Sequence, residues 1–262
     1  MPTTPLIAYS HVAKTFDGGR VVAVDDVSLD VAEGELLAIV GGSGSGKTTL
    51  LRLANRLIEA DKGTITVEGE DVRHADPILL RRRIGYVFQS GALFPHMSVA
   101  GNIGVTPKLL GWPAAEVSAR IDELLDLVRL DRSPYRDRMP HELSGGQRQR
   151  VGVARALAAK PRIVLMDEPF GALDPLTRDA LGDDYRELHR KLGLTTVMIT
   201  HDMTEAVLLA DRIAVMSGGK LLAQGTPAEL AASGDSYVGE LLRTPRRQAE
   251  RLNEALPRGD AA

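Results

Sequence analysis

Short apolar runs recur along the chain and predict the strands of a buried sheet. Five runs of four or five residues are rich in aliphatic and β-branched side chains, as expected of strands that are covered on both faces. They occupy residues 36–40, 84–88, 163–166, 195–199 and 213–216. Because helical patterns lie between several of these runs, we expect an α/β fold in which helices flank a parallel sheet.

Helical periodicity is clearest in the middle of the chain. Apolar residues between Val117 and Val128 fall on one face of a helix that should start near Ala115. A second helix is expected to begin at Ser144. Between about residues 91 and 160 the pattern consists mainly of helices and loops, which predicts an inserted helical subdomain.

Two further stretches and the end of the chain have patterns of their own. Residues 21–31 and 63–69 resemble hairpins and predict a small antiparallel β subdomain. After Arg243 the sequence becomes polar and charged, so we expect a short exposed helix followed by a frayed tail.

Composition excludes some classes of protein. The 262 residues carry a net charge of −3, which gives no overall attraction to nucleic acid, and no nucleic-acid partner is expected. The absence of cysteine excludes disulfides and thiolate metal sites. The first residues lack the blocks of a signal peptide, and no apolar run approaches the ~20 residues needed to span a bilayer.

A glycine-rich segment joins the first buried run to a helical run at residues 49–55. It consists of Gly41, Gly42, Ser43, Gly44, Ser45, Gly46, Lys47 and Thr48, with Thr49 following. The pattern is that of a phosphate-binding P-loop, and it has the strand–loop–helix context that this motif requires. Backbone N–H groups and the positive end of the helix suit phosphates. Lys47 is expected to reach the β- and γ-phosphates and Thr48 to bind Mg²⁺.

Two carboxylates follow the apolar run at residues 163–166. Their place at the carboxyl end of a buried strand is where α/β sheets bind ligands. We expect Asp167 to hold Mg²⁺ through water and Glu168 to orient the attacking water for phosphoryl transfer. The alternative is a solvated acidic loop, which the presence of a P-loop disfavours.

The most specific motif is Leu143-Ser144-Gly145-Gly146-Gln147. Taken alone, Ser144 and Gln147 have the spacing of a capping box in front of a helix at residues 147–159. Together with the P-loop, the motif makes the chain resemble the nucleotide-binding subunits of ABC transporters. The resemblance implies a P-loop NTPase (RecA-like) core, ATP as the nucleotide and a homodimer. In that family Ser144, Gly145, Gly146 and Gln147 would bind the γ-phosphate of ATP held by the other protomer.

The resemblance also implies roles for four isolated residues. His201 matches the switch histidine that contacts the γ-phosphate, and Gln89 matches the glutamine that touches Mg²⁺ or the attacking water. Phe16 matches the aromatic that stacks on adenine, and Asp174 matches the loop that contacts the other protomer. The simpler alternatives are an ordinary loop histidine, a polar strand end, a core aromatic and an N-cap for a helix starting at Pro175.

The resemblance covers about residues 7–242 as one ATP-binding cassette and leaves 243–262 as a polar tail. It implies ATP hydrolysis coupled to transport, integral-membrane permease partners and a peripheral location at the cytoplasmic face of the membrane. A solute-binding protein outside the cell would take part indirectly. Many relatives carry paired regulatory modules after the cassette, and this chain ends too soon for them, which puts osmotic gating by this subunit in doubt.

Segments outside the nucleotide site indicate the kind of transporter. Five segments look like those of ATPases that import quaternary amines such as glycine betaine or choline: residues 55–59, 90–103, 107–112, 188–197 and 201–206. A lipid- or sterol-trafficking ATPase and a non-transport ABC ATPase are the alternatives. The segment 93–112 is unusually apolar, through Leu93, Phe94, Met97, Leu109, Leu110 and Trp112. We expect a socket for a permease helix there, with local packing as the alternative.

Overall fold

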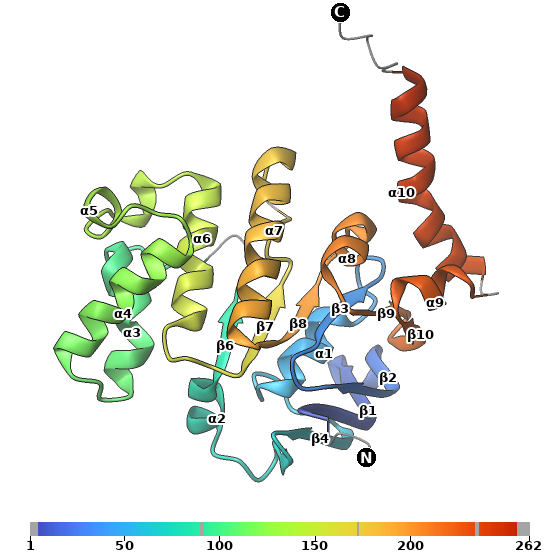
Figure 1. The fold of residues 1–262 in the computed structure, drawn as a ribbon. Helices are drawn as coiled ribbons and strands as arrows, with labels where there is room; N and C mark the ends of the chain where they lie inside the picture. The colour runs from blue at the N-terminus through green and yellow to red at the C-terminus, as the bar shows by residue number, and fades with distance from the viewer. Residues whose placement is uncertain (1–4, 90–91, 172, 234–235, 256–262) are drawn as a thin grey trace, which may run out of the picture.

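A mixed sheet of six strands forms the centre of the molecule (Figure 1). The computed structural model describes residues 5–89, 92–171, 173–233 and 236–255. The strand order is β10-β9-β3-β8-β7-β6. Their bounds are β3 Leu36–Val40, β6 Ile84–Val87, β7 Ile163–Asp167, β8 Thr195–Ile199, β9 Arg212–Ser217 and β10 Lys220–Gly225.

The five predicted strands are confirmed and run parallel, and β10 adds an antiparallel edge. All residues of β3, β7 and β8 are buried, because helices and a second sheet cover the two faces. These covered faces explain the unbroken apolar runs in the sequence. Parallel pairing brings the carboxyl ends of β3, β7 and β8 to one edge of the sheet.

The second sheet is antiparallel, with the order β2-β1-β4-β5. Its strands are β1 Ile7–Phe16, β2 Val21–Val31, β4 Lys62–Val67 and β5 Glu70–Asp71, and a short 3₁₀ turn, Asp17–Gly19, joins β1 to β2. The predicted small antiparallel subdomain is confirmed. The expected hairpin within residues 21–31 is wrong, because this stretch is one strand whose hairpin partner is β1.

Four helices between β6 and β7 gather on one side of the molecule (Figure 1). They are α3 Val99–Leu109, α4 Ala114–Leu127, α5 Arg132–Tyr135 and α6 Gly145–Leu157, with a 3₁₀ turn at Pro140–Glu142. The helix expected near Ala115 starts one residue earlier, and the helix expected from Ser144 starts at Gly145 because Ser144 is its N-cap. Residues 90–91, where this predicted subdomain would begin, lie outside the described residues.

The remaining helices are α1 Lys47–Ala54, α2 Pro77–Arg83, α7 Pro175–Leu192, α8 Met203–Leu209, α9 Pro227–Ala231 and α10 Ser236–Ala255. The short helix expected after Arg243 is wrong. A single helix of 20 residues runs through that position and projects from the body (Figure 1). The frayed tail predicted beyond it and the first residues, 1–4, lie outside the described residues. Within the described part of the chain, no helix has the length and apolar character to cross a membrane.

Candidate nucleotide site

Two glycines give the P-loop its shape between β3 and α1. Gly46 has φ 98°, and a Cβ there would lie 2.0 Å from the Ala23 carbonyl oxygen. Gly41 has φ 152°, and its Cβ would lie 2.1 Å from the Met216 carbonyl oxygen. Any side chain at either position would collide with backbone, so the loop can follow this path only with glycine.

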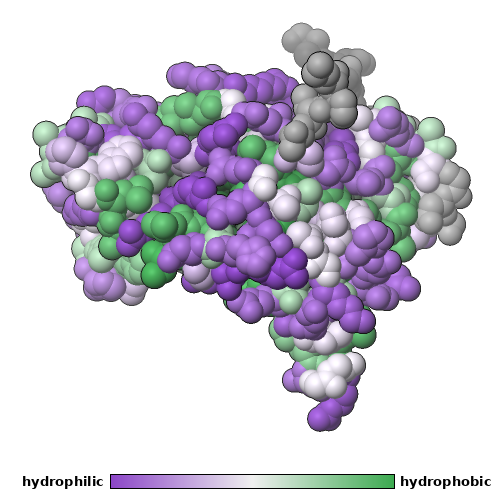
Figure 2. Space-filling view, turned by 90° about the horizontal axis from the view of Figure 1, so that it is seen from below, coloured by the Kyte–Doolittle hydropathy of each residue, from purple (hydrophilic) through white to green (hydrophobic). Residues whose placement is uncertain are grey.

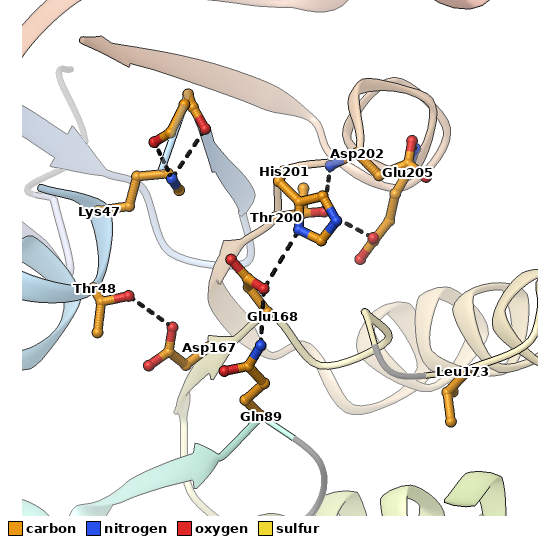
Figure 3. Close-up of polar contacts among 12 residues, drawn as sticks. Lys47, Thr48, Gln89, Asp167, Glu168, Leu173, Thr200, His201, Asp202 and Glu205 are labelled. Carbon is orange, nitrogen blue, oxygen red and sulfur yellow. Dashed lines mark hydrogen bonds and ion pairs between the residues drawn. The ribbon is translucent and has the colours of Figure 1, made fainter. Parts of the chain in front are cut away.

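Lys47 points back into the loop that precedes it (Figure 3). Its ammonium donates to the carbonyl oxygens of Gly41 at 3.0 Å and Gly42 at 2.9 Å. Burial lowers the pKa of Lys47, and the negative charges of Glu168 and Asp167 partly oppose this shift. The charge is therefore held inside the loop by backbone acceptors, at the place where a phosphate would supply anionic oxygens.

Asp167 ends β7 and faces the start of α1. Its Oδ1 accepts a hydrogen bond from the Thr48 hydroxyl at 3.0 Å (Figure 3). Its Oδ2 lies 3.4 Å from both Arg52 Nη2 and Tyr86 Oη. Three donors thus orient one buried carboxylate, and two hard oxygen atoms of the kind that Mg²⁺ prefers, from Thr48 and Asp167, lie side by side.

Glu168 is the meeting point of two further loops. Gln89 Nε2 donates to Glu168 Oε2 at 3.0 Å, and His201 Nδ1 lies 3.4 Å from the same oxygen (Figure 3). Glu168 has φ 47°, an uncommon backbone conformation for a residue with a side chain. Such conformations persist only where surrounding contacts hold them, and they cluster at functional sites. The structure therefore brings Gln89, Glu168 and His201 together beside the P-loop.

A hydrogen-bond network supports the chain around His201. The Thr200 hydroxyl donates to Glu205 Oε2 at 2.8 Å and accepts from Asp202 N at 3.0 Å. Asp202 caps α8 by accepting from Thr204 N at 2.8 Å. These contacts fix the backbone on both sides of His201.

Glu205 is a buried carboxylate within this network. Burial raises the pKa of Glu205 to about 7, with smaller raising effects from Asp202 and Glu168, while Thr200 and Arg178 act in the opposite direction. The folded state therefore holds this proton more tightly than the unfolded chain. The stability that results is present below the ordinary pKa of 4.5 and is lost as the pH rises through about 7.

We expect this loss of stability to appear when the wild type is compared with the Glu205→Gln variant, whose side-chain amide cannot ionise. Between pH 5 and pH 8 the free energy of unfolding of the wild type should fall by roughly 2–3 kcal/mol relative to the variant. Urea unfolding of both proteins across this range measures the difference. A difference that stays constant with pH would contradict a buried, titrating Glu205.

Other predicted residues lie elsewhere in the fold. Ser144 Oγ accepts a hydrogen bond from Gln147 N at 3.2 Å. In return, Gln147 Oε1 accepts one from Ser144 N at 2.9 Å, which confirms the capping box. Asp174 caps α7 by accepting from Thr177 N at 3.0 Å. None of the hydrogen bonds between described residues joins these helix starts to the P-loop. Phe16, at the end of β1, is 37% exposed and stacks with Lys14, so it is not a core aromatic.

Sequence reasoning missed the residues that hold the site in place. Arg52 and Tyr86 orient Asp167, while Thr200 and Glu205 support His201. No motif marks Arg52 or Tyr86, since their contacts depend on how α1 and β6 pack beside β7. A glutamate four residues after His201 was visible in the sequence, but only burial makes it unusual.

Comparison with known proteins identifies a family and related structures. A family model described as ABC transporter matches residues 24–171. The chain is 30% identical to the ATP-binding cassette MJ0796, whose structure is a dimer in a post-hydrolysis state bound to ADP and Pi. The TM-score is 0.76, and the match covers 84% of this chain and 98% of that one.

Curated relatives are closer in sequence. The chain is 47% identical to the glycine betaine/carnitine/choline transport ATP-binding protein OpuCA of Bacillus subtilis (strain 168), over 97% of this chain and 68% of that protein. It is 51% identical to the glycine betaine uptake system ATP-binding protein YehX of Escherichia coli (strain K12), over 85% of this chain and 71% of that protein.

A third relative serves a different solute class. The chain is 44% identical to the sulfate/thiosulfate import ATP-binding protein CysA of Xanthomonas campestris pv. campestris, over 98% of this chain and 77% of that protein. The chain spans only 63% of a further relative, the choline transport ATP-binding protein OpuBA of Bacillus subtilis. Motifs, fold and relatives agree, and the chain belongs to the ABC transporter family.

Proposed function

We propose that this chain is the ATP-hydrolysing subunit of an importer for a quaternary-amine osmoprotectant such as glycine betaine or choline. The observation that carries the ATPase assignment is the convergence of Gln89 and His201 on one oxygen of Glu168, directly after Asp167. A positioned carboxylate beside a phosphate-binding loop suits the activation of water for attack on a γ-phosphate.

The residues around the P-loop would divide the binding of MgATP among them. Backbone amides of residues 41–49 would hold the phosphates, Lys47 would pair with their charge, and Phe16 would stack on adenine. Thr48 would bind Mg²⁺ through its hydroxyl oxygen, and Asp167, whose Oδ1 lies 3.0 Å from that oxygen, would hold the ion through water. Gln89 would be a further ligand. When bound, Mg²⁺ neutralises charge that develops on the phosphates.

Glu168 and His201 would act on the attacking water and the γ-phosphate. Glu168 would orient and polarise the water, and the imidazole would keep water and carboxylate in line. Gln89 would move between Glu168 and Mg²⁺ as the site fills. The 24% exposure of the Glu168 side chain and 59% of His201 leave both reachable from solvent.

A complete site would need a second copy of the chain. Ser144–Gln147 starts a helix, and its positive end and free amides suit the γ-phosphate bound to a partner's P-loop. Asp174 would lie at the same interface. The dimeric structure of MJ0796 supports this arrangement. Residues 7–242 would form the cassette, with 91–160 as its helical subdomain and 243–262 as a tail.

The solute class is inferred from relatives, because no residue of this chain would touch the solute. One relative is named for glycine betaine, carnitine and choline transport and another for glycine betaine uptake, while CysA, at 44% identity, favours sulfate as a second candidate. Measuring solute uptake into vesicles that contain this chain and its co-purified permease would decide between the two solute classes. We expect ATP-dependent entry of labelled glycine betaine, choline or carnitine, and none of sulfate; sulfate uptake alone would overturn the assignment.

The permease would dock on a groove between the sheet and the helical side. The groove has a volume of about 390 Å³, and its lining includes Phe88, Phe94, Leu109 and Arg155. Arg155 lies over both rings, 5.9 Å from Phe88 and 5.5 Å from Phe94. From below, hydrophobic surface gathers on the helical side (Figure 2). A cytoplasmic helix of the permease, on the inner face of the membrane, would fill this groove, and an extracytoplasmic solute-binding protein would act through the permease.

Not all of the predicted apolar segment is available for docking. Phe94, Leu109 and Leu110 are 41%, 59% and 40% exposed, whereas Leu93 and Trp112 pack against the core. Buried Asn102 shapes the segment before α3 through its side chain, which accepts from Phe94 N at 2.7 Å and donates to Met97 O at 3.0 Å. The proposed docking surface therefore includes fewer of these apolar residues than the sequence analysis expected.

Phe94→Asp tests this surface. We expect the variant to keep basal ATP hydrolysis within about twofold, because Phe94 is 41% exposed and the substitution leaves the residues of the nucleotide site unchanged. Co-purification with the permease should be lost, since a buried interface carboxylate costs several kcal/mol. Leu222→Asp, at a 43% exposed apolar residue of β10, is the control. Normal assembly and transport by Phe94→Asp would place the socket elsewhere.

A further inference from the structure

One arginine joins the two loops that carry Glu168 and His201. Arg178 lies in the first turn of α7, and its Nη2 donates to the Leu173 carbonyl oxygen at 3.1 Å. Its Nη1 donates to Asp202 Oδ2 at 3.3 Å. Leu173 and Asp202 come from different loops, so the planar guanidinium holds a fixed spacing between them.

Both loops lead directly to the reacting groups. The loop from Glu168 to α7 is short, and Gly171 N bonds back to Glu168 O at 3.4 Å while Leu173 N bonds to Phe170 O at 3.1 Å. Asp202 follows His201 and also caps α8. A shift of Leu173 or Asp202 would therefore move the backbone that carries Glu168 or His201.

The His201 imidazole depends on this backbone for its position. Its side chain is 59% exposed, and its one polar contact among the described residues is with Glu168 Oε2 at 3.4 Å. A single long contact does not fix a ring. What sets the distance between imidazole and carboxylate is the relative position of the two loops.

We propose that Arg178 is a positioning residue that keeps His201 in line with Glu168 by clamping Asp202 to the Leu173 carbonyl. The clamp rests on the proposed ATPase function and adds a residue to it. It also connects the site to the partner, because Leu173 immediately precedes Asp174 at the proposed dimer interface. If a partner chain displaced that segment, the Arg178 side chain would move Asp202, and with it His201.

Arg186 on the same helix supplies a matched control. Its guanidinium pairs with Asp211, with Nη1 3.2 Å from Oδ2, and Asp211 in turn accepts from Leu36 N at 2.8 Å. This pair ties α7 to the start of β3, at the opposite end of that strand from the P-loop. Loss of Arg186 removes an arginine–aspartate pair from α7 without touching Glu168 or His201.

The test compares Arg178→Met, Arg178→Lys and Arg186→Met in steady-state hydrolysis of MgATP by the whole chain. We expect both Arg178 variants to lose about 10- to 100-fold in kcat with the KM for ATP within about twofold, because misplacement of about 1 Å has effects of this size. Lysine keeps the charge but cannot bridge two acceptors as a fork. Arg186→Met should keep kcat within about threefold.

A double-variant cycle separates positioning from general damage. If Arg178 acts through His201, then His201→Ala should lower kcat at least about tenfold less in the Arg178→Met protein than it does in the wild type. Multiplicative losses, or equal losses in Arg178→Met and Arg186→Met, would overturn the inference. An active wild type with unaffected Arg178 variants would overturn the clamp alone, whereas a wild type without ATP hydrolysis would overturn the proposed function itself.

Discussion

Replacing Glu168 with glutamine should lower ATP hydrolysis by about 10²- to 10⁴-fold while ATP binding stays near the wild-type level. Glutamine has the shape of glutamate and can still accept from Gln89, so the site keeps its geometry. It cannot polarise water as a carboxylate does. ATP that binds but is not hydrolysed should then hold two chains together, since a ligand that binds only the closed form stabilises it by mass action.

Sedimentation velocity and equilibrium nucleotide binding measure both expectations. The Glu168→Gln protein should shift from monomer toward dimer with MgATP and stay largely monomeric with ADP. Glu116→Gln, at an exposed glutamate of α4, should behave as the wild type. Equal losses of binding and turnover would mean that Glu168 is structural, and a variant that stays monomeric at high concentration with ATP would argue against the composite site.

The sequence predicted the sheet and the chemical centre because both leave local patterns. β3, β7 and β8 are buried on both faces. Their residues are therefore apolar, apart from two threonines at the start of β8 and Asp167 at the end of β7. Parallel strands then bring their carboxyl ends to one edge. The proximity of the P-loop, Asp167, Glu168 and His201 follows from that topology.

Other features depend on contacts that no local pattern reveals. β1 pairs with β2 and β4 through several register shifts, and His11 has φ 51°, so the alternation that marks a strand is broken. α10 continues through Pro245 into the polar stretch where the sequence predicted only a short helix. The clamp of Arg178 exists only because α7 and the loop after β8 meet in the fold.

Two inactive variants should restore activity when mixed. Lys47→Ala should weaken ATP binding about 30-fold or more, because a buried charge contact to phosphate is lost. Gly145→Asp should leave the P-loop intact but prevent the start of α6 from binding a γ-phosphate. A Cβ at Gly145 meets Arg148 and Leu173 only at 3.9 Å, so the side chain fits. A carboxylate in the first turn of a helix is favourable for folding, yet it repels an incoming γ-phosphate.

The mixture works only if each site takes its two halves from different chains. A dimer of one Lys47→Ala chain and one Gly145→Asp chain holds one intact P-loop facing one intact Ser144–Gln147 segment. Random pairing makes half the dimers mixed, so hydrolysis should recover to about a quarter of the wild-type rate. Mixing the double variant with an equal amount of the wild type is the control, because each of those mixed dimers lacks an intact site. Only the wild-type dimers then work, which leaves about a quarter of the rate, whereas sites made within one chain would leave about half. If mixed dimers form but the two single variants stay inactive together, both halves of the ATP site must belong to one chain.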